Sequence, residues 1–153
     1  METHYHVGMN GYKKVTYPDY VDTDGIGPCI GIGIFNIKTK NAYLAHFLPM
    51  TKDLLKVLDE AVEEASSPSD LELVVAGNTS LDDQTLIDLG EDLQKHRYNL
   101  KSYSEWIRTE IKNRGLRIKK DYLKENYLDG SFSISIDTKK SKLVVNYDET
   151  YSF

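Results

Sequence analysis

Apolar and polar residues alternate along several short segments of the chain, a pattern typical of half-buried β-strands. Isoleucines at positions 30, 32 and 34 predict a strand over residues 30–37. The turn-forming residues 39–41 follow, and residues 42–47 are predicted to return as the second strand of a hairpin. Further strands are predicted at residues 7–15, 71–76, 131–137 and 142–147, the last two forming a C-terminal hairpin.

Segments with a helical period lie between these strands. Thr51 is placed to cap a helix that ends near Ser66, and Ser80 is placed to cap a second helix that runs past Leu93. Ser102 and Glu105 have the spacing of a capping box at the start of a third helix. Strands at both ends of the chain with helices between them predict an α+β fold with an at least partly antiparallel sheet.

Length and composition indicate one globular domain. The 153 residues contain no repeat or linker, so we expect a single domain over residues 1–153, with residues 1–6 frayed. Neither a membrane-spanning stretch nor a signal-like segment is evident, so we expect a cytoplasmic protein without membrane insertion. A net charge of −5 disfavours a nucleic-acid partner.

Charge is segregated along the sequence. Residues 48–96 hold twelve acids and three bases, whereas residues 97–125 hold nine bases and four acids. This polarity either steers a partner or reflects the solvated faces of helices.

The densest group of unusual residues precedes the single cysteine, Cys29. Gly25, Gly27 and Pro28 shape the backbone just before the thiol, and such a bend is expected to expose a side chain at the rim of the sheet. The N–H groups near Gly25 and Gly27 are candidate oxyanion donors for acyl transfer.

The hairpin brings a histidine back toward this cysteine. His46 lies seventeen residues after Cys29, so two arms of similar length place the two residues at the same end of the hairpin. An imidazole beside a thiol takes up its proton and stabilises the thiolate, and such a thiol is expected to react quickly with iodoacetamide near pH 7. Thr23 is a candidate for orienting the imidazole or binding the substrate.

Structural roles remain open for each of these residues. A free cysteine on an apolar strand is often buried, His46 is equally interpretable as a core histidine, and Thr23 as a turn residue. His4 and His6 lack the further ligands of a metal site, and residues 25–30 do not form a dinucleotide fingerprint.

Together these residues resemble a known family. Thr23-x-Gly25-Ile26-Gly27-x-Cys29, followed by residues 45–49 (Ala-His-Phe-Leu-Pro), is similar to the motif of CheD chemoreceptor glutamine deamidases. The resemblance covers nearly the whole chain, from Val7-Gly8-Met9 to the final hairpin.

The resemblance implies both a fold and a mechanism. It implies a mixed β-sandwich flanked by about three helices, as in the catalytic domain of cytotoxic necrotizing factor toxins. Cys29 would be the nucleophile, His46 the general base and then acid, and Thr23 the third member of a site that converts glutamine to glutamate and ammonia. No metal or organic cofactor is implied, and the partners would be a glutamine-bearing protein and a CheC-like phosphatase.

Some positions depart from the family pattern. Pro28 replaces a serine, Asp92-Leu93 an arginine-asparagine pair, and Ser131 an arginine. These changes bear on substrate choice and docking. Two other functions therefore stay open: an N-terminal asparagine amidase and a non-catalytic CheD-like signalling module.

Overall fold

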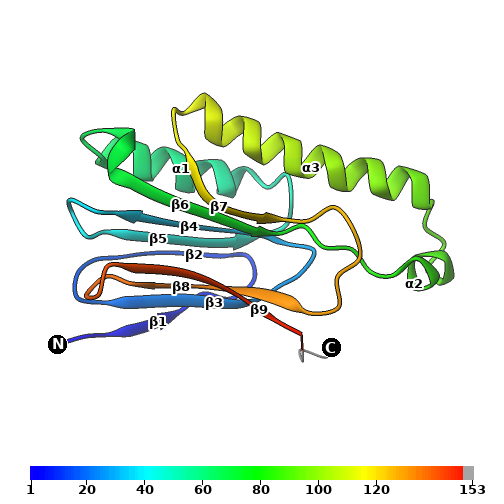
Figure 1. Cartoon of the computed structure of the whole chain (residues 1–153), viewed down its shortest axis with the longest axis horizontal. Coiled ribbons are helices and arrows are strands. Elements are labelled where there is room, and N and C mark those ends of the chain that lie inside the picture. The colour runs from blue at the N-terminus through cyan, green and yellow to red at the C-terminus, as the bar shows by residue number, and fades with distance from the viewer. Residues whose placement is uncertain (150–153) are drawn as a thin grey trace.

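The fold was analysed in a computed structural model, which describes residues 1–149. The chain forms two β-sheets stacked on each other, with helices covering the outer face of one sheet (Figure 1). The elements are β1 (His4–His6), β2 (Gly11–Val15), β3 (Tyr20–Ile26), β4 (Ile30–Asn36), β5 (Ala42–Phe47), α1 (Lys52–Glu64), a 3₁₀ turn η1 (Pro68–Asp70), β6 (Leu71–Gly77), α2 (Asp83–Asp88), α3 (Leu93–Asn113), β7 (Ile118–Leu123), β8 (Ser131–Asp137) and β9 (Lys142–Asp148).

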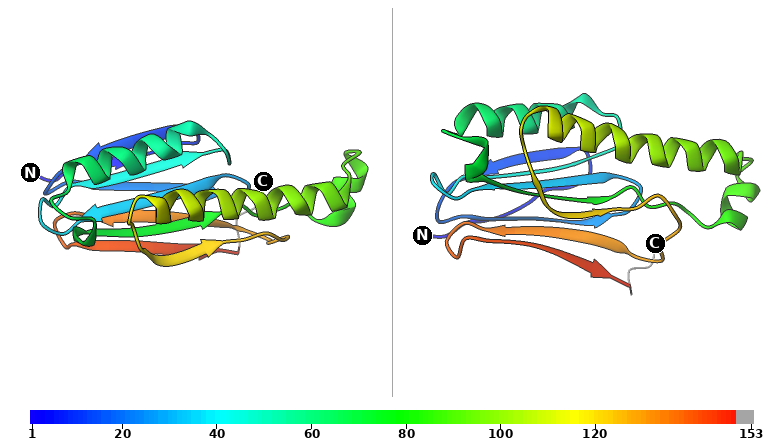
Figure 2. Two further views of the ribbon diagram at one scale, coloured as in Figure 1. Left: turned by 90° about the horizontal axis from the view of Figure 1, so that it is seen from above. Right: turned by 45° about the horizontal axis from the view of Figure 1, so that its top comes forward.

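The two sheets have mixed strand directions. The strand order is β1-β3-β8-β9 in the first sheet and β2-β5-β4-β6-β7 in the second. Most neighbours are antiparallel, but β1 pairs parallel with β3 and β6 parallel with β7. Helices α1 and α3 lie side by side across the second sheet (Figure 2). The predicted α+β sandwich with flanking helices is confirmed.

Alternation along β4 explains how the layers pack. Ile30, Ile32 and Ile34 face the helices and join a core that includes Leu58 and Ile107. The intervening glycines face the other sheet, where a Cβ at Gly33 would lie 2.8 Å from a methyl carbon of Ile134. Because glycine has no side chain, the two sheets approach each other closely at their centre.

Both predicted hairpins are present. Strand β4 pairs antiparallel with β5, and β8 with β9. Strands β3 and β7 were not predicted: the run of β3 contains polar residues and a glycine, and β7 is an exposed, lysine-bearing edge strand.

The predicted frayed N-terminus is wrong. His4–His6 form β1, which pairs with Tyr20–Asp22, and the N–H of Val7 donates to the carbonyl of Asp22 at 2.8 Å. The predicted strand over residues 7–15 is shortened to β2, because residues 7–10 cross from one sheet to the other and Asn10 adopts a positive φ of 65°.

The predicted second and third helices have different boundaries. Asp82, not Ser80, caps α2 by accepting from the N–H of Thr85, and α2 ends before Gly90, whose φ is +80°. Helix α3 begins after its cap Asp92. Ser102 lies inside α3, where its hydroxyl donates to a carbonyl of the preceding turn, so the predicted capping box is wrong.

Candidate active site

The register of the β4–β5 hairpin places His46 on the side of the sheet that faces the other sheet. Gly31 is paired with His46, and Ile30 with Phe47. Ile30 and Phe47 belong to the core under the helices, so Gly31 and His46 face the opposite way. Alternation continued by one residue puts Cys29 on the same face as His46, diagonally across the hairpin.

The ladder between β4 and β6 also continues through the cysteine. The carbonyl of Cys29 accepts from the N–H of Asn78 at 2.8 Å, and the carbonyl of Gly27 accepts from the N–H of Thr79 at 3.0 Å. The loop between β3 and β4 is therefore held against the end of β6. These contacts use carbonyl groups, and the oxyanion role of Gly25 and Gly27 stays a prediction.

Thr23 reaches His46 from the other sheet. Its hydroxyl lies 2.6 Å from the carbonyl of Val7 and 2.9 Å from Nδ1 of His46. A hydroxyl has one proton and a carbonyl only accepts, so Thr23 donates to Val7 and accepts from an Nδ1–H of His46. This assigns the neutral tautomer of His46: Nε2 carries the lone pair and is the basic atom.

Nε2 of His46 is buried and has no hydrogen-bond partner among residues 1–149. An unpaired polar atom at a buried position costs stability, because burial removes its hydration without replacement, so such atoms are uncommon except where a function requires them. The basic nitrogen is thus oriented by Thr23 and left free to accept a proton.

Burial controls the ionisation of the pair. Cys29 is 4% exposed and His46 is 3% exposed. Burial raises the pKa of the Cys29 thiol and lowers the pKa of His46, the latter effect partly opposed by the charge of Asp24. Both groups are therefore neutral near pH 7 in the free protein, and the sequence-based expectation of an exposed thiol is not met.

The glycine-rich approach to Cys29 has a structural explanation. Gly25, with a φ of +64°, lies in an irregularity where the β3–β8 register shifts between Thr23 and Ile26. Such a bulge re-aims the strand. Pro28 then contributes no N–H to the loop.

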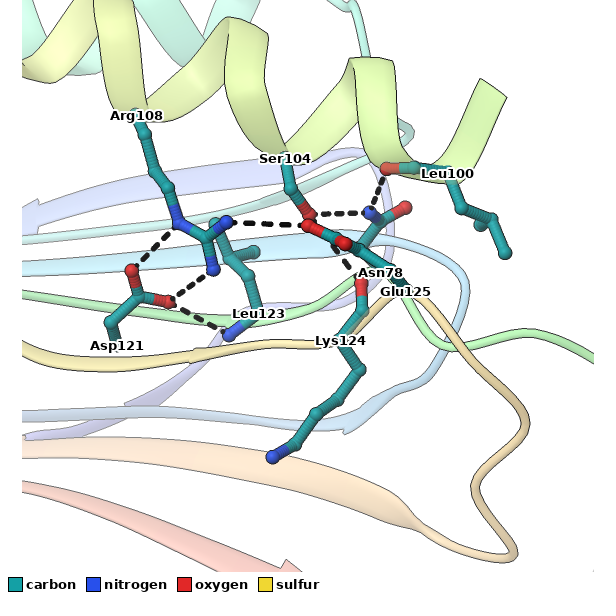
Figure 3. Close-up of polar contacts among 8 residues, drawn as sticks. All are labelled: Asn78, Leu100, Ser104, Arg108, Asp121, Leu123, Lys124 and Glu125. Carbon is teal, nitrogen blue, oxygen red and sulfur yellow. Dashed lines mark hydrogen bonds and ion pairs between the residues drawn. The ribbon is translucent and has the colours of Figure 1, made fainter. Parts of the chain in front are cut away.

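Asn78 is a residue of the site that sequence reasoning missed. Besides holding the carbonyl of Cys29, its Nδ2 donates to the carbonyl of Leu100 and to the hydroxyl of Ser104, both at 2.7 Å (Figure 3). Its φ of +57° is a conformation that asparagine tolerates. The signal available in the sequence is Gly77-Asn78 directly after a buried strand, a pair that also suits an ordinary strand end.

A neighbouring ion-pair network fixes α3 against β7. Arg108 contacts both carboxylate oxygens of Asp121 at 2.8 and 3.1 Å and also reaches Glu125 (Figure 3). With Asn78 and Ser104, these contacts hold α3 over the end of the sheet that carries Cys29.

Two further features bear on ligands. Among residues 1–149, no group of three or more His, Cys, Asp or Glu side chains is arranged to hold a metal ion. Within the same part of the chain, no helix has the length and apolar character needed to cross a membrane.

Comparison with known proteins gives limited similarity. The chain matches no established family profile. It is 31% identical over 89 residues to a probable chemoreceptor glutamine deamidase CheD of Haloarcula marismortui, and the match covers 49% of this chain and 51% of that protein. The chain therefore spans about half the length of this curated relative. The similarity supports a CheD-like relationship at the level of family resemblance.

Proposed function

We propose that this protein is a thiol-dependent amidohydrolase that deamidates glutamine side chains of a protein, as CheD-type enzymes do. One observation carries the proposal: Thr23 holds His46 as the Nδ1–H tautomer and leaves a buried, unpartnered Nε2 on the sheet face to which Cys29 belongs. The name of the relative from Haloarcula marismortui adds support from similarity.

The first half of the reaction forms a thioester. Nε2 of His46 takes the thiol proton as Sγ of Cys29 attacks the carboxamide carbon, so the buried pair becomes charged only as the new bond forms. The imidazolium is stabilised because Nδ1–H still donates to Thr23. His46 then gives its proton to the amide nitrogen, the C–N bond breaks, and ammonia leaves.

The second half regenerates the enzyme. Nε2 of His46 accepts a proton from a water molecule that attacks the thioester carbon, and the C–S bond breaks. Cys29 recovers its proton and the product is a glutamate side chain. The sum is amide plus water giving acid plus ammonia, which these three residues accomplish without a cofactor.

The same proposal names a substrate, a partner and a location. The substrate would be a chemoreceptor-like protein, a CheC-like phosphatase would be a partner, and the reaction would occur in the cytoplasm. These expectations follow from the resemblance to CheD.

The burial of Cys29 favours one alternative. A thiol with a raised pKa and 4% exposure also suits a CheD-like module that binds a signalling protein without catalysis. Retention of a His46 that Thr23 orients on the same face of the sheet argues for the enzyme.

Mass spectrometry of candidate partner proteins tests the proposal. Wild-type protein should convert glutamine to glutamate in a partner and release ammonia, and Cys29→Ser and Cys29→Ala should not. A substitution of the exposed Ile37 at the other end of β4 is the matched control and should keep activity. Full turnover by Cys29→Ala would exclude the proposed nucleophile.

A further inference from the structure

An apolar groove borders the loop that carries Cys29. Its cavity measures about 450 Å³ and is lined mainly by apolar side chains. Three of these, Leu48, Leu81 and Leu89, are 52%, 42% and 65% exposed. Large apolar side chains exposed together around one cavity mark a binding surface, because a soluble protein otherwise tends to bury them.

The groove adjoins the proposed active site on two sides. Pro28, which lines it, precedes the nucleophile, and Leu48 and Pro49 follow His46 by two and three residues. Its far wall includes Leu86 and Leu89 from the α2 region and Leu100 from α3. Figure 1 shows α2 and the first turns of α3 extending past the end of the sheet, and Figure 2 shows the same overhang from two other directions.

A second cavity adjoins the groove at Pro28. It measures about 270 Å³ and shares Pro28, Thr79 and Leu81 with the groove. Cys29 itself lines neither space. Pro28, in the loop of the nucleophile, therefore borders both cavities, so a polypeptide seated in the groove contacts this loop.

The segment around α2 that borders the groove is acidic. Residues 81–92 contain five acids and no base, and Glu91 lines the groove itself. Asp83 is paired with Arg97 at 2.7 Å, which leaves the other four acids without a basic ion-pair partner among the pairs found in residues 1–149.

We propose that this groove binds the segment of the protein substrate next to the target glutamine, and that this segment carries apolar side chains flanked by lysine or arginine. The inference rests on the proposed deamidase function and adds the substrate preference to it. Leucines of the groove gain by burial against apolar partners, and the acids around α2 attract basic flanks and repel acidic ones. The same charges disfavour an acidic substrate segment.

Binding of two synthetic peptides tests the proposal on the wild-type protein. Both peptides carry two leucines around a central norleucine in place of glutamine, and they differ only in flanking lysines or flanking glutamates. The lysine peptide should bind at least about tenfold more tightly by fluorescence anisotropy, and added salt should reduce this difference. Equal affinity, or tighter binding of the glutamate peptide, would overturn the proposal.

Substitutions locate the binding site. Leu89→Ser should weaken binding of the lysine peptide about fivefold or more, and Glu91→Lys should reduce the preference for lysine over glutamate flanks. Ile37→Ser and Glu63→Lys are matched controls at exposed positions away from the groove and should leave binding unchanged. Loss of binding in the controls, or unchanged binding in Leu89→Ser with a native circular dichroism spectrum, would contradict the groove as the site.

Catalysis separates this inference from the proposed function. In glutamine versions of the two peptides, ammonia release at a higher kcat/KM from the lysine peptide supports both proposals. Selective binding without ammonia release would reject the deamidase and keep the groove. Ammonia release at equal kcat/KM from both peptides would keep the deamidase and reject the groove preference.

Discussion

At the scale of single residues, the hydroxyl of Thr23 decides which nitrogen of His46 is basic. The Nδ1–H tautomer exists because Thr23 donates its own proton to the carbonyl of Val7. Removing the hydroxyl removes the acceptor for Nδ1–H and leaves that proton buried without a partner. The orientation of the His46 imidazole thus depends on one oxygen atom, Oγ1 of Thr23.

We predict that Thr23→Val lowers kcat for ammonia release by about ten- to a hundredfold, because general-base catalysis of that size is lost when the base is misoriented. The unfolding free energy, measured in urea, should also fall by about 1–3 kcal/mol owing to the unsatisfied buried donor. Thr23→Ser keeps the hydroxyl and is the control, with near-normal kcat. Normal turnover in Thr23→Val would show that the hydroxyl does not orient the base.

The buried thiol makes a second prediction at this scale. Burial raises the pKa of Cys29, so the thiolate fraction at pH 7 is lower than for an ordinary cysteine. Alkylation of the native protein by iodoacetamide should be slow at pH 7 and still rising at about pH 9, above the ordinary cysteine pKa of about 8.5.

The urea-unfolded chain provides the control for this measurement, since Cys29 is the only cysteine and should there titrate normally. Native labelling at pH 7 as fast as in the unfolded chain would contradict the raised pKa. Slow labelling agrees with a thiol that loses its proton only during attack, whereas the sequence alone had predicted fast labelling.

At the scale of elements, the sequence predicted strands and hairpins better than boundaries. The alternate isoleucines of β4 and the turn after it were enough to predict the hairpin that carries His46. The break between α2 and α3 was missed, because the apolar residues before and after Gly90 keep a helical period. Strand β3 was missed because its buried Thr23 is polar and its register is interrupted.

The candidate site was predicted only as far as local geometry reaches. Spacing along the chain predicted that Cys29, His46 and Thr23 lie together; the structure joins Thr23 to His46 by a hydrogen bond, and the place of Cys29 in the site stays a prediction. The partners Val7 and Asn78 were not predictable, because they arrive through pairing of segments distant in sequence. The backbone at Cys29 likewise depends on the end of β6, because the N–H of Asn78 donates to the carbonyl of Cys29.

Asn78 links three elements, and its removal should loosen them. Asn78→Gly keeps the left-handed backbone but loses the donors to Leu100 and Ser104, so we predict a loss of about 2 kcal/mol in unfolding free energy, about 1 kcal/mol for each hydrogen bond. Asn78→Asp should cost more, because a carboxylate would face the carbonyl of Leu100. Urea denaturation measures both.

Ser104→Ala is the matched variant for the contact between Asn78 and Ser104. It removes one of the two acceptors while leaving the backbone of residue 78 untouched, so its cost should be smaller than that of Asn78→Gly. A larger loss in Ser104→Ala would place the main contribution on the contact of Ser104 with the carbonyl of Lys124 instead.

At the scale of the whole molecule, the N-terminal segment joins the two sheets at the proposed active site. Strand β1 lies at the edge of one sheet, residues 7–10 cross over, and β2 lies at the edge of the other. The crossing supplies the carbonyl of Val7 to Thr23, and the N–H of Asn10 donates to the carbonyl of His46 at 2.6 Å. The terminus therefore supports Thr23, which is the partner of the imidazole, and the backbone of His46.

Deletion of residues 1–6 tests this arrangement against the frayed terminus that the sequence predicted. Loss of β1 removes its ladder with β3 and frees the Val7 end of the crossing, so we predict a fall of about 2 kcal/mol in unfolding free energy and a lower kcat. Deletion of residues 1–2 alone is the control and should change neither, since these residues are exposed and lie outside β1. If deletion of residues 1–6 left both urea denaturation and ammonia release at the wild-type level, the pairing of β1 would contribute nothing to the site. That is the outcome expected of a frayed terminus.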